Sequence, residues 1–76
     1  MNNRDATTLN AEEYADQVIE GYRVFDDADW TDADRATFVT DEVVRYICGT
    51  AEVARRHVNR ASVRTMVARR LAAARR

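Results

Sequence analysis

The sequence predicts an all-α fold: a small three-helix bundle, or a four-helix bundle if the last segment breaks. The 76 residues include no proline and only two glycines, Gly21 and Gly49, whereas β-rich and disordered chains usually contain more of both. Apolar residues recur at helical spacing between polar turns. A chain of this length forms one domain, residues 1–76. Because its core is small, we expect it to form a homo-oligomer. The polar residues 1–9 are expected to be disordered.

The first predicted helix starts after Asn10. Asn10 is a good N-cap residue, and Glu13 can complete a capping box by bonding back to it. One face is apolar and consists of Ala11, Tyr14, Ala15, Val18, Ile19, Tyr22 and Phe25. The opposite face carries Glu12, Glu13, Asp16, Glu20 and Arg23.

The second predicted helix starts after Thr31, which caps it, with Asp32 and Asp34 in the first turn where the helix dipole favours anions. Its apolar face consists of Ala33, Ala36, Val39, Thr40, Val43, Val44 and Ile47. Asp34, Arg35, Asp41, Glu42 and Arg45 form the charged face, and Phe38 lies among them. Gly49 suits the C′ position that ends a helix, and Thr50 is then the next N-cap.

The third segment, residues 51–76, forms either one long helix or two shorter ones. As a single helix it would place Arg60 and Arg64 inside an apolar arc. A break near Asn59 to Ser62 removes this conflict, because either residue can cap a new helix. Val63, Val67, Leu71 and Ala74 then form a clean apolar stripe.

The two halves of the chain carry opposite charge. Residues 1–47 contain twelve acids and four arginines, 4 − 12 = −8, and residues 48–76 contain eight arginines and one acid, 8 − 1 = +7. Such asymmetry indicates that the basic half meets an anion such as nucleic acid, a membrane surface or an acidic protein. The alternative is that the halves neutralise each other within the fold or across a dimer.

The stretch Thr50 to Arg64 resembles the helix-turn-helix of bacterial DNA-binding transcription regulators, and the resemblance extends over residues 50–70. Glu52-Val53-Ala54-Arg55-Arg56 is similar to the short first helix, and Asn59-Arg60-Ala61-Ser62-Val63-Arg64 to the start of the recognition helix. The glycine usual in the family's turn is absent, since Val58 follows His57 directly.

The resemblance implies that the second helix enters the major groove of DNA. Arg60 and Arg64 would then contact bases, and Asn59 and Ser62 would bond to phosphate or base. Arg55, Arg56, Arg69 and Arg70 would neutralise phosphates. A homodimer reading two half-sites is the expected form.

Other site chemistries find little support in the sequence. Cys48, His57 and Glu52 lack a further ligand at metal-site spacing, and no catalytic constellation is present. We therefore expect no metal, no cofactor and no enzymatic activity. The acids between Asp26 and Asp34 lack the glycine and the terminal glutamate of a calcium loop.

Two functions therefore stay open. The first is a small cytoplasmic DNA-binding regulatory protein that uses its arginine-rich C-terminal segment. The second is a protein-interaction or inhibitor module, of a phage-type or accessory kind, with Trp30 and Phe38 at its interface. One cysteine and the lack of a long apolar run predict an intracellular protein that does not span a membrane.

Overall fold

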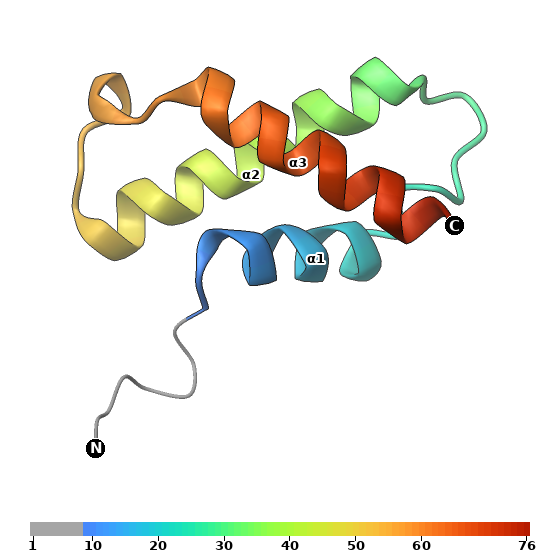
Figure 1. Cartoon of the computed structure of the whole chain (residues 1–76), viewed down its shortest axis with the longest axis horizontal. Coiled ribbons are helices and arrows are strands. Elements are labelled where there is room, and N and C mark those ends of the chain that lie inside the picture. Colours follow the sequence, from blue (N-terminus) through green and yellow to red (C-terminus); the bar gives the residue numbers. More distant parts are fainter. Residues whose placement is uncertain (1–8) are drawn as a thin grey trace.

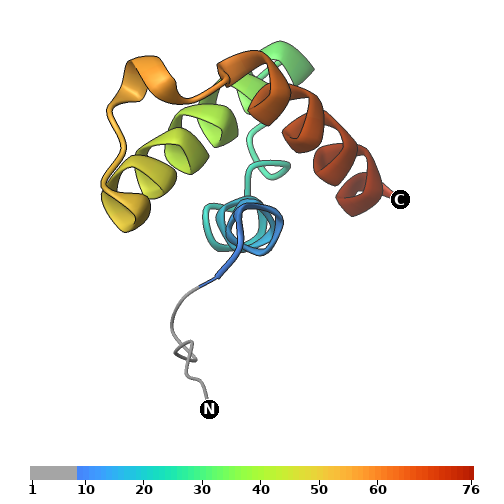
Figure 2. The same cartoon turned by 60° about the vertical axis from the view of Figure 1, so that its left-hand side comes forward.

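The computed structural model describes residues 9–76 and confirms the all-α prediction. Its elements are α1 (Ala11–Gly21), α2 (Asp32–Ala51), a short 3-10 turn η1 (Arg55–His57) and α3 (Arg60–Arg75). The helices α2 and α3 cross each other, and α1 lies beneath the angle between them (Figures 1 and 2). The turn η1 lies at one end of the molecule, and the α1–α2 connection and the C-terminus lie at the other (Figure 1).

Both predicted helix starts are confirmed, because each is determined by local side-chain chemistry. The Asn10 side chain accepts a hydrogen bond from the Glu13 backbone at 2.8 Å, and Glu13 accepts one from the Asn10 backbone at 3.2 Å. Thr31 and Asp34 form the same reciprocal box at the start of α2, at 3.0 Å each. Each box satisfies two backbone donors that would otherwise lack a partner.

The predicted end of the second helix is wrong. The helix passes through Gly49 and ends at Ala51, and Glu52 adopts the left-handed conformation with φ of 56°. The next backbone N–H, that of Val53, donates to the Cys48 carbonyl at 3.2 Å. This is a Schellman ending, in which a hydrophobic residue after the left-handed position packs back onto the helix.

α1 ends in the same way. Arg23 has φ of 53°, and the N–H of Val24 donates to the Ile19 carbonyl at 3.3 Å. Val24 is buried in the core. Both helices therefore end at a non-glycine residue in the left-handed conformation, Arg23 and Glu52, and neither glycine adopts it.

The segment of residues 51–76 does not form one long helix, which confirms the predicted break. Residues 52–59 contain only the short turn η1, and α3 begins at Arg60 with Asn59 as its N-cap. The Asn59 side chain accepts a hydrogen bond from the Ser62 backbone at 3.0 Å. The break turns Val63, Val67 and Leu71 toward the core.

The core is built almost entirely of small aliphatic side chains. Its buried members are Ala15, Val18, Ile19, Val24, Ala36, Val39, Val43, Val44, Val63, Val67 and Leu71. Four predictions of burial are wrong: Tyr22 is 61% exposed, Ala33 and Ala74 are exposed, and Arg35, expected on the charged face, is buried. Tyr22 follows the last residue of α1, so its side chain leaves the apolar stripe of that helix.

The chain is also fixed just ahead of α1. The Leu9 backbone exchanges two hydrogen bonds with the Tyr46 hydroxyl, both at 2.8 Å. The Tyr46 ring stacks on Tyr14 with centroids 4.0 Å apart. The predicted disorder of the N-terminus therefore does not hold at Leu9, and residues 1–8 lie outside the described residues. Across residues 9–76, every helix is too short or too polar to cross a bilayer.

Candidate functional site

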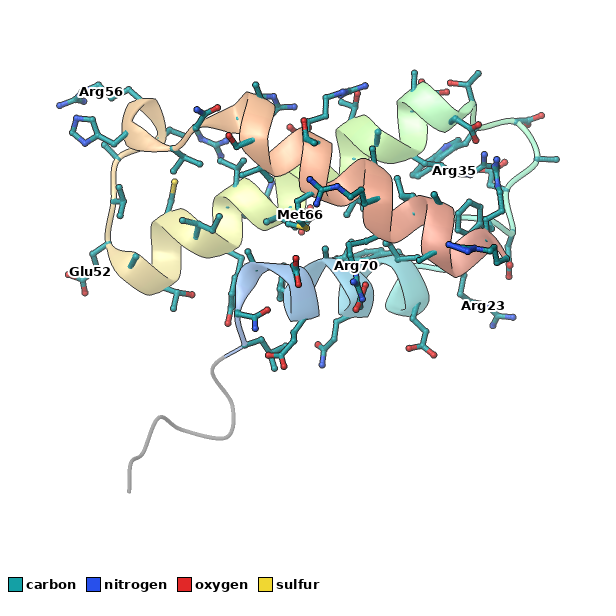
Figure 3. All side chains as sticks on the ribbon, viewed as in Figure 1. Arg23, Arg35, Glu52, Arg56, Met66 and Arg70 are labelled. Carbon is teal, nitrogen blue, oxygen red and sulfur yellow. The ribbon has the colours of Figure 1, made fainter. Side chains whose placement is uncertain are left out.

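The arginines of α3 are largely directed back onto the acidic half of the chain. Three ion pairs at 2.6 Å join α3 to the other helices: Arg60 to Asp41, Arg70 to Asp16, and Arg75 to Asp32. Figure 3 shows Arg70 lying between α3 and α1. The opposite charges of the two halves thus partly neutralise each other within one chain.

The residue types at the helix edges explain this arrangement. On α3, Arg64 and Arg75 flank the buried stripe on one side and Arg70 flanks it on the other, as the 3.6-residue period requires. Arg60 is the first residue of the helix. The Arg70 guanidinium donates two hydrogen bonds to Asp16, at 2.9 and 2.6 Å. This bidentate bond is the main cause that raises the pKa of Arg70 above its ordinary value.

Asp32 is the most heavily engaged carboxylate at the other end of α3. It accepts two hydrogen bonds from Arg75, at 3.2 and 2.6 Å, and one from Arg35 at 3.1 Å. The hydrogen bond from Arg75, with its charge and that of Arg35, holds the pKa of Asp32 below its ordinary value of 3.8. Arg75 has a raised pKa for the same reason.

Three of the four residues predicted to contact bases make contacts within the protein instead. Arg60 pairs with Asp41, and Arg64 donates to the Thr37 hydroxyl at 3.1 Å. The oxygen of the Asn59 side chain serves the helix cap, and Ser62 is exposed beside it. The structure does not bring these four side chains into one outward-facing row.

The remaining predicted phosphate contacts lie apart from one another. Arg55 and Arg56 are exposed on η1, and Arg69 is exposed on α3; Figure 3 shows Arg56 at the η1 end of the molecule. Within residues 9–76, these three arginines form no ion pair. They are the cationic groups best placed to meet an external anion.

The short first helix expected over Glu52 to Arg56 does not form. Residues 52–54 form a turn followed by irregular chain and contain no helix. Residues 52–59 separate α2 from α3. This connection is longer than the turn of about three to four residues that joins the two helices of a helix-turn-helix. No family model, curated protein or solved structure matches this chain.

The two predicted interface residues do come together. The rings of Trp30 and Phe38 lie with centroids 5.3 Å apart, and Tyr22 meets Phe38 edge-on at 5.0 Å. We call these three residues the aromatic cluster. The sequence pattern predicted Tyr22 to be buried, because its spacing fits the apolar face of α1. Its position directly after Gly21, the last residue of α1, was the one sign that its side chain could leave that face.

A metal centre is not indicated. Within residues 9–76, no three His, Cys, Asp or Glu side chains are grouped so that they could hold an ion. Cys48 is a half-buried free thiol, and His57 is exposed on η1.

Proposed function

We propose that this protein is a protein-interaction module that binds a partner through the aromatic cluster. The observation that carries the proposal is the convergence of Tyr22, Trp30 and Phe38 at the surface, with Tyr22 61% exposed. They come from the end of α1, the α1–α2 connection and α2. Tyrosine, tryptophan and phenylalanine are enriched at protein interfaces and often dominate binding energy there.

The composition of the core supports the same proposal. Every side chain in the buried core cluster is aliphatic, and Trp30 and Phe38 only pack against its edge. Large rings provide the most apolar area that this chain can bury. The aliphatic core does not bury these rings completely. A partner that covers the aromatic cluster would remove their remaining apolar area from water.

A photo-crosslinking residue in place of Tyr22 tests the proposal in cells that naturally make the protein. We expect a discrete adduct, either with a second copy or with one other protein, identified by mass spectrometry. Phe38→Asp should abolish it, because a charge placed at the centre of an apolar contact cannot be solvated there. Ala61→Asp, which adds the same charge at an exposed position of α3, should leave it intact.

Two results would count against this function. One is the absence of a discrete adduct. The other is an adduct that survives Phe38→Asp, since it would then form without the aromatic cluster. Circular dichroism of each variant checks that the helices are retained.

Nucleic-acid binding is the second candidate, favoured by one observation. Arg55 and Arg56 follow each other on η1 with both side chains exposed and without an ion pair among residues 9–76. Arginine suits phosphate contacts, and such contacts weaken steeply as salt rises.

The test is a titration with random-sequence duplex DNA at low and moderate salt. Binding that falls with salt and weakens in the double variant Arg55→Ala/Arg56→Ala would support this second function. Arg60→Ala should matter less, because its guanidinium is held by Asp41. No binding at low salt would exclude the DNA function and leave the protein-interaction proposal untouched.

A further inference from the structure

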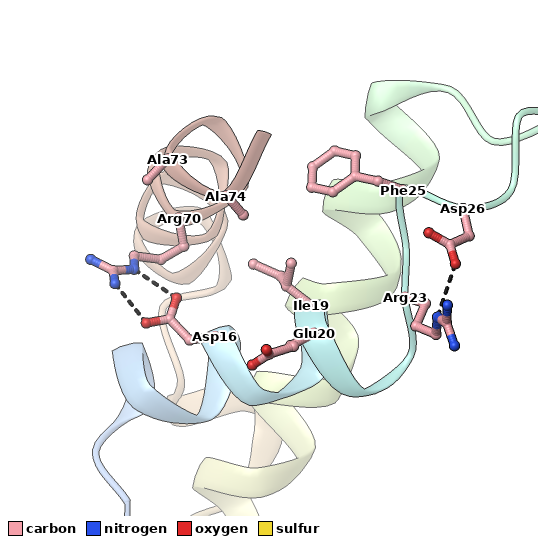
Figure 4. Close-up of a pocket in the computed structure, with 9 residues that line it drawn as sticks. All are labelled: Asp16, Ile19, Glu20, Arg23, Phe25, Asp26, Arg70, Ala73 and Ala74. Atoms are coloured by element: carbon pink, nitrogen blue, oxygen red, sulfur yellow. Dashed lines mark hydrogen bonds and ion pairs between the residues drawn. The ribbon is translucent and has the colours of Figure 1, made fainter. Parts of the chain in front are cut away.

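An open groove runs between α1 and the end of α3, and no residue of the aromatic cluster lines it. It has a volume of about 600 Å³. Figure 4 shows Ile19 and Phe25 pointing into it, with Ala73 and Ala74 on the α3 side. Because these two alanines have only methyl side chains, the last turns of α3 leave space beside α1 that no residue of 9–76 fills.

The rim of the groove is charged, and its charges are unequally satisfied. Asp16 is held by Arg70, and Asp26 is held by the Arg23 guanidinium at 2.9 Å. Glu20 lies between these two pairs (Figure 4) and takes part in no ion pair within residues 9–76. It is exposed, so it is the rim charge left for a ligand.

The helix that forms this rim is acidic throughout. Residues 11–21 include Glu12, Glu13, Asp16 and Glu20 and no arginine or lysine. Arg70 is the cation that reaches this face from α3. Three carboxylates and two arginines line the groove, and the arginines pair with Asp16 and Asp26. The groove therefore combines an apolar floor with one uncompensated negative charge at Glu20, a combination that favours a ligand with both apolar and basic groups.

We propose that the groove binds a basic peptide segment of another protein, with one bulky apolar side chain on Ile19 and Phe25 and an arginine or lysine at Glu20. The apolar side chain would fill the volume beside Ala74, which faces Ile19 and Phe25 (Figure 4). The basic group would pair with Glu20, the one groove carboxylate without an ion pair within residues 9–76. This inference does not depend on the aromatic cluster, whose residues do not line the groove.

The test begins with a random dodecapeptide library displayed on phage and selected on the folded protein. We expect enriched peptides to share an arginine or lysine near a leucine, isoleucine or phenylalanine. The best peptide is then synthesised, and its dissociation constant is measured by fluorescence anisotropy.

Two variants test the two halves of the contact, each with a matched control. Glu20→Arg should weaken peptide binding at least about tenfold, because the reversed charge replaces an attraction with a like-charge repulsion. Asp29→Arg makes the same charge change on an exposed loop residue outside the groove. Ala74→Phe should weaken it similarly by filling the groove beside Ile19 and Phe25. Ala61→Phe adds the same ring at an exposed position of α3 away from it.

The outcomes separate cleanly. Loss of affinity in both groove variants, with both controls near the unsubstituted value, supports the proposal. Enrichment of acidic peptides, no enrichment, or equal loss in Asp29→Arg would overturn it. Peptides that depend on Phe38 and not on Ala74 would also overturn it, while supporting the aromatic cluster as the binding surface.

Discussion

Replacing Arg35 with methionine should remove a large part of the stability of this protein. Arg35 is 8% exposed, yet it carries a charge, which is costly unless its donors are satisfied. Its Nε donates to the Val24 carbonyl at 2.8 Å, and its guanidinium also donates to the Asp27 carbonyl at 3.0 Å. The side chain thereby fixes the α1–α2 connection to α2.

The size of the loss follows from these contacts. A hydrogen bond from a charged donor contributes roughly 1.5–3 kcal/mol. The bond to Val24 is buried and should count near the upper value, whereas the Asp27 carbonyl is only partly buried and can regain water. The pair with Asp32 adds little, because that side chain is 72% exposed. Together we expect a loss of about 3–4 kcal/mol.

This loss is a large fraction of the total free energy of unfolding. A domain of this length has a total free energy of unfolding of roughly 4–11 kcal/mol. With an m-value of about 1 kcal/mol/M, the urea midpoint should fall by about 3–4 M. Equilibrium unfolding in urea, followed by circular dichroism at neutral pH, measures it directly.

Two companion variants make the reasoning refutable. Arg45→Met removes an arginine of the same helix that is 68% exposed and approaches only Glu42, at 3.5 Å; we expect it to change the free energy of unfolding by less than about 0.5 kcal/mol. Arg35→Lys keeps the charge but cannot reach both carbonyls, so it should recover only part of the loss. If Arg35→Met costs less than about 1 kcal/mol, the connection is held by other contacts and this reasoning fails.

Three further predictions concern stability. Thr40→Val should raise the free energy of unfolding by about 1 kcal/mol, measured by urea unfolding, because the fully buried Thr40 hydroxyl has no hydrogen-bond partner within residues 9–76; a loss of stability would show that the hydroxyl is satisfied. Glu52→Gly should stabilise the protein by about 1 kcal/mol, because Glu52 occupies a left-handed position. Gly49→Ala should stabilise it by about 0.5–1 kcal/mol, since a Cβ at position 49 meets nothing within 4 Å. A lower melting temperature in either variant would contradict the assigned helix end. Asp32 has a lowered pKa in the folded protein, so its contribution is complete above the unfolded value near 3.8 and is lost as pH falls through the folded value. Asp32→Asn should therefore flatten the fall in stability below about pH 4, and an unchanged acid profile would show that Asp32 does not cause it.

Local chemistry explains which predictions from the sequence were confirmed. The starts of α1 and α2 depend on Asn10, Glu13, Thr31 and Asp34, residues within one turn of each other. The break before α3 likewise follows from one side chain, Asn59. Capping energies of this kind are decided by neighbouring residues, so a sequence pattern is sufficient to find them.

The helix ends were harder to predict because they depend on packing. Glycine at position 49 was the local signal, but α2 ends where Val53 can turn back toward the helix. Arg35 shows the same limit for charge. Its spacing places it among exposed residues, and only the α1–α2 connection, folded over it, supplies the carbonyls that make burial favourable.

For the candidate sites, the sequence established the charge of each half and the presence of Trp30 and Phe38 on the same stretch of chain. Whether the arginines of residues 48–76 are available depended on how α3 lies across α1 and α2, since Arg60, Arg70 and Arg75 each find a carboxylate that is distant in sequence. Tyr22 joins the aromatic cluster, and Glu20 and Ala74 line one groove, for the same reason. Composition determines which charges and rings a chain possesses, while contacts between helices determine which of them are used internally and which remain for a partner.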